Sequence, residues 1–145
     1  MAITRQNPNT VFLGGDRTQI GDLAASEAIT PGHLVERFNN GGIIRFRKHS
    51  DAAGYNGRLV ATEQAMLNKG VDDDYAANDL VEVSALAPGA KAWMLIASGQ
   101  NVAAGDELES AGNGTLRTGS GVKLFTALDN KPNVTVTTRI RVEAL

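Results

Sequence analysis

The chain has 145 residues, of which 42% are hydrophobic and 5% aromatic, with a formal net charge of −2 and no cysteine. These values fit one globular domain and exclude disulfides, thiolate nucleophiles and cysteine-based zinc sites. The mildly acidic balance argues against a general nucleic-acid-binding protein, and no apolar run reaches the roughly 18–20 residues that span a bilayer. The N-terminus lacks the apolar core of a signal peptide, so we expect no export by that route, no membrane partner and no nucleic-acid partner.

Residues 1–27 differ from the rest of the chain. They are polar, are interrupted by Asn7-Pro8 and Gly14-Gly15-Asp16, and carry one apolar cluster, Val11-Phe12-Leu13. Two interpretations are open: a mobile terminus, or an extended arm that becomes ordered against a neighbouring molecule. The arm is favoured because the cluster would otherwise remain in water. Its candidate contact residues are Ile3, Val11, Phe12 and Leu13.

Residues 28–145 consist of short apolar runs that alternate with turn signals such as Asn39-Asn40-Gly41-Gly42 and Pro88-Gly89. This spacing predicts an all-β domain, a compact sandwich or barrel of short antiparallel strands. The runs are residues 33–38, 42–47, 58–63, 79–86, 92–97, 106–110, 121–128 and 133–145.

Three segments interrupt or modify this simple pattern. Residues 62–70 contain helix formers and a terminal Gly70, so one short helix is expected there, in competition with a strand that continues from Arg58. Residues 92–97 are apolar on both faces, which predicts burial on both sides, in the core or at a subunit interface. In residues 133–145 apolar and polar residues alternate, which predicts a half-buried strand.

An eight-residue pattern, x-x-[PA]-[GN]-[HD]-x-[VL]-E, occurs three times without gaps, at residues 29–36, 75–82 and 102–109. Its fourth position is Gly32, Asn78 or Gly105, the residue types that accept the positive φ of a type II turn. The next residue, His or Asp, can bind a nearby backbone amide and close the turn. Each copy is followed by another turn signal, so the pattern predicts a turn and a β-hairpin three times.

The clusters of charged residues have structural explanations. Asp106, Glu107 and Glu109 could suggest a metal or acid–base site, but the repeat explains Asp106 as a turn residue and Glu109 as an outward strand residue. Asp72-Asp73-Asp74 lacks the ligand spacing of a calcium loop and is expected to be a solvated loop. His33 and His49 fall on different predicted elements. We therefore expect no catalytic, cofactor-binding or metal site, and no enzyme.

Residues 45–49, Arg-Phe-Arg-Lys-His, form the densest basic stretch. One interpretation is a strand with a basic outer face. The alternative is a surface that contacts an acidic protein partner.

The order of turns and strands over residues 28–120 carries a resemblance. The residues concerned are Ala28-Ile29, Gly32, Val35, Leu59-Val60-Ala61, Asp79-Leu80-Val81-Glu82-Val83, Ala104-Gly105-Asp106, Leu108, Gly112-Asn113-Gly114 and Leu116. This order resembles the small capsid decoration (cement) proteins of tailed bacteriophages. The resemblance implies a β-tulip or barrel-like domain that forms homotrimers on the outer surface of the virion capsid, bridges major capsid proteins and stabilises the shell. It also implies an N-terminal arm that pairs with the shell.

Two other functions stay open. One is a different virion β-module, such as a tail or fibre component or a glycan-binding adaptor, although the few aromatic residues argue against glycan binding. The other is a small β-barrel enzyme, which would need a polar pocket with a perturbed histidine or carboxylate.

Overall fold

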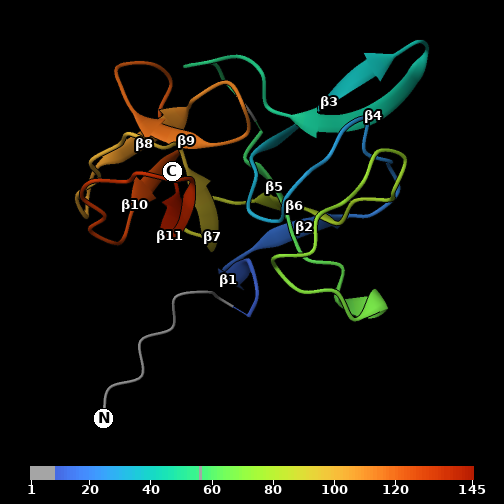
Figure 1. Cartoon of the computed structure of the whole chain (residues 1–145), viewed down its shortest axis with the longest axis horizontal. Coiled ribbons are helices and arrows are strands. Elements are labelled where there is room, and N and C mark those ends of the chain that lie inside the picture. Colours follow the sequence, from blue (N-terminus) through green and yellow to red (C-terminus); the bar gives the residue numbers. More distant parts are fainter. Residues whose placement is uncertain (1–8, 56) are drawn as a thin grey trace.

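The computed structural model describes residues 9–55 and 57–145, and these residues are almost entirely β (Figure 1). The all-β prediction is confirmed. Within this part of the chain no helix is long and apolar enough to cross a membrane. The elements are β1 (Phe12–Gly14), β2 (Arg17–Ile20), β3 (Val35–Asn40), β4 (Ile43–Lys48), β5 (Leu59–Ala61), the 3-10 helix η1 (Ala65–Leu67), β6 (Val83–Leu86), β7 (Lys91–Ile96), β8 (Glu107–Ser110), β9 (Leu116–Thr118), β10 (Phe125–Ala127) and β11 (Thr138–Ala144).

A closed five-stranded barrel occupies one side of the molecule (Figure 1). Its order is β7-β11-β10-β8-β9, and β9 returns to β7 through a parallel pairing of Ile96 with Leu116. The other pairings in the ring are antiparallel. Strand β1 adds to the beginning of β7, where Phe12 lies opposite Ala92. Closure gives each strand of the ring a partner on both sides, which removes the free edges of an open sheet.

The other side of the molecule contains a three-stranded sheet, β2-β6-β5, and a separate β3–β4 hairpin. In Figure 1 the hairpin projects away from the barrel. Two bridges join the hairpin to its surroundings: Leu34 pairs with Val60 of β5, and Ala25 pairs with Phe46 of β4. We refer to residues 17–86, which contain this sheet, the hairpin and the short helix η1, as the open half.

Buried side chains form two clusters. The larger one fills the barrel and includes Phe125, which is fully buried. The smaller one lies between the hairpin and the β2-β6-β5 sheet and includes Phe46, also fully buried. Aliphatic residues supply most of both clusters, as expected for a chain with so few aromatic residues.

Strand β7 is buried on its inner face and, at Leu95, on its outer face, which is the burial on both sides that residues 92–97 predicted. Met94 and Ile96 are fully buried in the barrel core, and Leu95, on the other face, is only 6% exposed. The turn of the first repeat covers that outer face, because the Leu95 amide donates a hydrogen bond to the Gly32 carbonyl at 3.1 Å. The burial is therefore a contact between the two halves of one chain.

The last strand and the short helix are both shorter than the sequence pattern suggests. Strand β11 begins at Thr138, and Val136, predicted to be on its buried face, is 69% exposed. Asn133 has a positive φ of 54°, which breaks the extended backbone before the strand. Helix η1 spans three residues and ends at Asn68, which adopts the left-handed conformation. Of the short helix expected within residues 62–70, the structure has only this single 3-10 turn.

Hairpins follow only two of the three repeat copies. Strands β3 and β4 pair with each other, as do β8 and β9. The hairpin predicted after the second copy is wrong, because β6 pairs with β2 and β5 and has no edge left for β7. The Ala87–Ala90 turn, with Gly89 at a φ of 90°, instead directs the chain from the open half into the barrel.

Candidate interaction surfaces

The three repeated turns share one geometry. Gly32, Asn78 and Gly105 have φ values of 101°, 76° and 94°. In each turn the backbone amide of the residue that follows donates a hydrogen bond to the carbonyl three positions earlier, at 3.0–3.1 Å. The side chain of that same residue accepts the amide hydrogen of the first turn residue: Thr30 donates to His33 Nδ1 at 3.0 Å, Ala76 to Asp79 at 2.8 Å and Ala103 to Asp106 at 2.9 Å.

The candidate arm residues that the structure describes pair with their own chain. Val11 is 1% exposed; its amide donates to Glu63 at 2.9 Å and its carbonyl accepts from Trp93 at 2.8 Å. Phe12 packs against the barrel cluster, and Leu13 is 44% exposed. Ile3 lies outside the described residues. Within the isolated chain, Leu13 is thus the described arm residue with the largest apolar surface open to a partner.

Glu109 is buried, which corrects its prediction as an outward strand residue. Its side chain is 3% exposed, pairs with Arg117 at 2.9 Å and accepts the Gly121 amide at 2.5 Å. The loop that carries Gly119 and Gly121 folds over the carboxylate so closely that a Cβ at either glycine would clash with it. Residues Asp106 and Glu109 therefore serve a turn and a buried ion pair, respectively.

Arg139 joins the two halves of the molecule. Its side chain is 9% exposed, and its guanidinium donates to the Pro31 carbonyl at 3.1 and 3.2 Å and to the Val71 carbonyl at 2.5 Å. It also pairs with Asp72 at 2.8 Å. The sequence alternation places Arg139 on the outer face of β11, and the structure covers that face with the first repeated turn and the acidic loop.

The two histidines have different environments. His33 is largely buried, and this desolvation, together with the nearby charges of Lys48 and Arg139, lowers its pKa to about 4. His49 is 1% exposed and bonds to two partners. Because the Tyr55 carbonyl can only accept, His49 Nε2 donates to it at 3.2 Å, and Nδ1 is hydrogen-bonded to the Ser110 hydroxyl at 2.6 Å. Both ring nitrogens of His49 are thus engaged, and Nδ1 of His33 is engaged in the first repeated turn.

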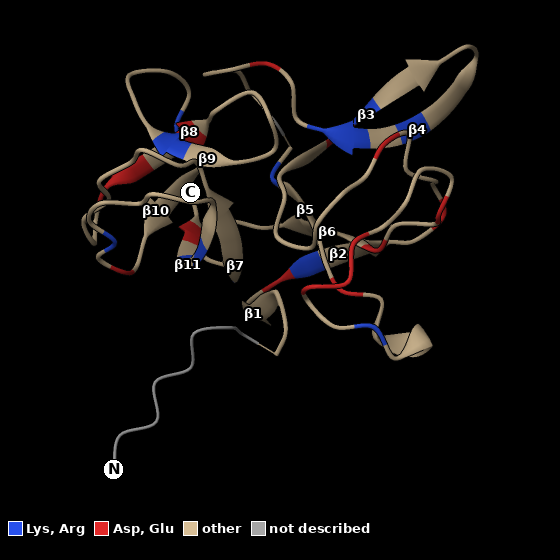
Figure 2. Ribbon diagram, in the orientation of Figure 1, with Lys and Arg blue, Asp and Glu red and all other residues tan. Residues whose placement is uncertain are grey.

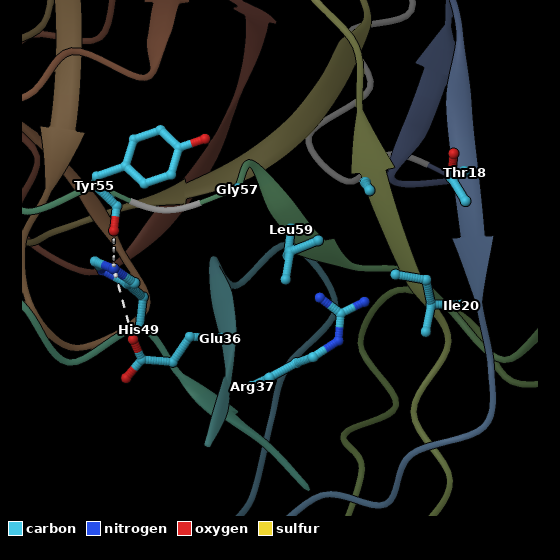
Figure 3. Close-up of a pocket in the computed structure, with 9 residues that line it drawn as sticks. Thr18, Ile20, Glu36, Arg37, His49, Tyr55, Gly57 and Leu59 are labelled. Carbon is cyan, nitrogen blue, oxygen red and sulfur yellow. Dashed lines mark hydrogen bonds and ion pairs between the residues drawn. The ribbon is translucent and has the colours of Figure 1, made fainter. Parts of the chain in front are cut away.

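A groove of about 520 Å³ opens between the hairpin and the β2-β6-β5 sheet (Figure 3). One face of the sheet forms its floor, and the side chains of β3 and the loop after β4 form its wall. In Figure 3 the Arg37 guanidinium points toward Leu59 and Ile20 on the floor. The lining residues are Thr18, Ile20, Glu36, Arg37, His49, Tyr55, Gly57, Leu59 and Ala85. We call this the sheet groove.

The polar wall of the sheet groove is held by an ion-pair network. Glu36 accepts from Arg47 Nε at 2.7 Å and from the Ser50 hydroxyl at 2.7 Å, and its other oxygen lies 3.7 Å from His49 Nε2. Partial burial alone would raise the pKa of Glu36, but these hydrogen bonds outweigh it and hold the pKa below its ordinary value. Glu36 is therefore a charged, fully engaged group.

The β3–β4 hairpin is basic. Residues 35–48 contain four Lys and Arg but one Glu, and Figure 2 shows this positive colour on both strands and on β2. Arg47 pairs with Glu36 and Lys48 with Glu27. Among the described residues, Arg37 and Arg45 have no carboxylate at ion-pair distance; Arg45 bonds instead to Asn78 at 2.9 Å. The charges of these two side chains are thus not neutralised by any carboxylate among the described residues.

An exposed apolar surface surrounds η1. Met66, Leu67 and Leu80 are 94%, 66% and 57% exposed, and Leu67 and Leu80 line one shallow hollow with Tyr75. We call Met66, Leu67 and Leu80 the η1 patch. Sequence reasoning missed this patch. A signal was present, because Met66 and Leu67 are two consecutive large apolar residues followed directly by Asn68, Lys69 and Gly70, which favours exposure over burial in a core.

No group of three or more metal-ligating side chains occurs in the described part of the chain. The geometry offers surfaces that can bind macromolecules: an apolar-floored groove, a basic hairpin and an exposed apolar patch.

Comparison with known proteins identifies a shared fold. No protein-family model and no curated protein matches the chain. Among solved structures, it is similar to the head fibre gp8.5 N base of bacteriophage phi29, with a TM-score of 0.60 and 13% sequence identity. The likeness covers 90% of this chain and 95% of that chain. At this identity the shared feature is the fold, and it extends over nearly the whole of both chains.

Proposed function

We propose that the chain is a structural protein of a tailed-phage head, a decoration (cement) protein that binds the outer surface of the capsid as a homotrimer. In this role it bridges neighbouring major capsid proteins and stabilises the shell, without a catalytic step or a cofactor. The observation that carries the proposal is the fold shared with a phage head fibre base over nearly the full length of both chains.

The molecular surfaces support a binding role. The barrel is closed and supplies a rigid body, whereas the open half presents exposed apolar and basic groups on short elements. Repeated attachment of many identical copies to a symmetric shell needs only modest affinity at each contact, because a trimer engages several sites together.

The name of the structural neighbour also favours a second candidate, a domain that anchors a head fibre. The two candidates place the chain differently. A cement protein lies between capsid subunits at many symmetric positions, whereas a fibre base lies beneath an elongated projection. Electron microscopy of heads that carry the protein separates them, since each predicts a distinct density.

The direct test is cosedimentation of the purified protein with expanded heads from which it has been removed. We expect saturable binding and an increase in the temperature at which the heads release DNA. Heads that neither bind the protein nor gain stability would contradict a cement role.

The contribution of the N-terminal arm needs a truncation that spares the fold. Removal of residues 1–20 would take away β1, β2 and the buried Val11, so lost binding would report unfolding. Deletion of residues 2–8, which removes Ile3, and the single change Leu13→Ser leave the described strands in place. We expect each to weaken head binding while the thermal unfolding temperature is unchanged, with Val136→Ser as the exposed apolar control. Full binding by both variants would refute an arm contact.

A further inference from the structure

We infer that the η1 patch of one copy binds in the sheet groove of the next, so that the chain assembles head to tail with other copies of itself. This inference rests on the homo-oligomer in the proposed function and adds how its subunits join.

The η1 patch projects into solvent from a short, exposed segment. Met66 and Leu67 project from a single helical turn, and residues 65–70 and 76–80 around them are exposed. Exposed large apolar side chains grouped in this way are typical of interaction sites. No described core residue belongs to η1, so the fold does not require this pair to be apolar.

The sheet groove offers a complementary apolar surface. Leu59, Ala85 and Thr18 lie in one row across the sheet, since Ala85 is paired with both of the others. Ile20 extends the same face, and the groove above this floor remains open. A Met and a Leu side chain placed on this floor would be removed from water, together with the parts of Ile20 and Ala85 that remain exposed.

Charge favours contact between the η1 patch and the sheet groove over contact between two η1 patches. Residues 62–82, which carry the η1 patch, contain six Asp and Glu and one Lys. The hairpin beside the sheet groove contains four Lys and Arg and one Glu, and Arg37 itself lines the groove without a carboxylate partner among the described residues. A patch-to-patch contact would bring acidic segments together, whereas a patch-to-groove contact pairs opposite charges. The second arrangement is heterologous, and such contacts form rings when the rotation closes.

The absence of cysteine makes a crosslinking test clean, because every thiol is then an introduced one. The test protein is the full chain with Met66→Cys and Thr18→Cys, oxidised at concentrations where light scattering shows the oligomer. We expect a covalent ladder up to the full oligomer from the double variant and no crosslink from either single variant. The matched control combines Val136→Cys, also highly exposed, with Thr18→Cys, and it should remain uncrosslinked.

Two charge and shape variants provide an independent measurement. Met66→Ser with Leu67→Ser removes the patch, and Thr18→Trp with Arg37→Glu blocks the groove; all four positions are exposed, so folding should be preserved. Each variant should have one third of the mass of the wild-type trimer, while Lys131→Glu, an exposed charge elsewhere, should retain the full mass. Circular dichroism checks the fold of each.

The outcomes are distinct. A dimer crosslinked by Met66→Cys alone, oligomers that survive both variants, or a wild-type protein that stays monomeric would each overturn the head-to-tail contact. Head binding is measured separately by cosedimentation. If the head-to-tail oligomer forms but does not bind heads, this inference stands and the cement function is refuted. If the chain binds heads but never oligomerises, the cement function stands and this inference is refuted.

Discussion

The barrel and the open half bury their apolar residues in different ways. The barrel closes on itself, so its strands have partners on both sides and its cluster holds most of the buried residues. The open half has a three-stranded sheet and a hairpin that cover each other incompletely and leave the sheet groove between them. It also carries Met66, the most exposed large apolar side chain among the described residues. A closed scaffold therefore allows the rest of the chain to leave apolar side chains and a groove exposed.

The largest test of this difference is the loss of one phenylalanine from each core. Phe125→Ala in the barrel should lower the free energy of unfolding by about 3–5 kcal/mol, as for other buried Phe-to-Ala changes. Phe46→Ala should instead open the hairpin and its sheet locally, because fewer elements cover that cluster. Amide hydrogen exchange of both variants distinguishes the effects. If Phe46→Ala lowers protection equally in the barrel strands, the two halves form one cooperative unit.

A second test removes the side chain that joins the halves. Arg139→Met should lower the free energy of unfolding by about 2–4 kcal/mol, since it leaves the Pro31 and Val71 carbonyls and Asp72 without their donor. Arg141→Met is the control on the same strand. Its guanidinium pairs with Asp129 at the surface, so this change should cost less than about 1 kcal/mol. Denaturant unfolding of both variants measures the difference, and equal costs would show that Arg139 does not join the halves.

A third test uses pH at the junction of the halves. His33 has a folded pKa of about 4, below the ordinary value of 6.5, so the folded state binds fewer protons than the unfolded state between these values. Stability should therefore fall as the pH is lowered from 6.5 toward 4, by about 2–3 kcal/mol.

The control for the pH test is His33→Asn, which keeps an oxygen that can accept the Thr30 amide but cannot titrate. Its unfolding free energy should change less over the same pH range. A variant with the same pH slope as the wild type would assign the effect to other groups.

The smallest expected loss of stability comes from glycine substitutions in two equivalent turns. Gly32→Ala and Gly105→Ala both force a side chain into a positive φ, which costs about 1–2 kcal/mol. A Cβ at Gly105 meets nothing, but one at Gly32 lies 3.3 Å from the Trp93 carbonyl of β7. Gly32→Ala should consequently be the more destabilising of the two in thermal unfolding. Equal shifts would mean that the packing of this turn on the barrel is not tight.

Local features were predictable from the sequence. The repeated turns depend on a residue that tolerates positive φ and on a side chain that reaches an amide three positions earlier, so eight residues contain the whole interaction. The all-β class also follows from local alternation and turn spacing. The same reasoning failed for Glu109, because its burial depends on a loop that returns over it twelve residues later.

The candidate interaction surfaces were harder to predict from the sequence. The basic stretch at residues 45–49 pointed correctly to a charged strand, and the structure places part of it beside the sheet groove. Nothing in the sequence brings Thr18, Arg37 and Leu59 together, since they belong to three strands of two separate sheets. The η1 patch had a local signal, but its exposure depends on what the remainder of the chain leaves uncovered.

By itself, the sequence determined the all-β class, the three repeated turns and the absence of any cysteine chemistry, because these follow from the backbone preferences and side chains of near neighbours. The tertiary structure alone decided that β6 and β7 separate into different sheets, that the barrel closes through Ile96 and Leu116, and that Arg139 lies buried between the halves. Each of these depends on pairing between residues that are distant in the chain, where several partners satisfy the same local pattern and only the packing of the whole domain selects one.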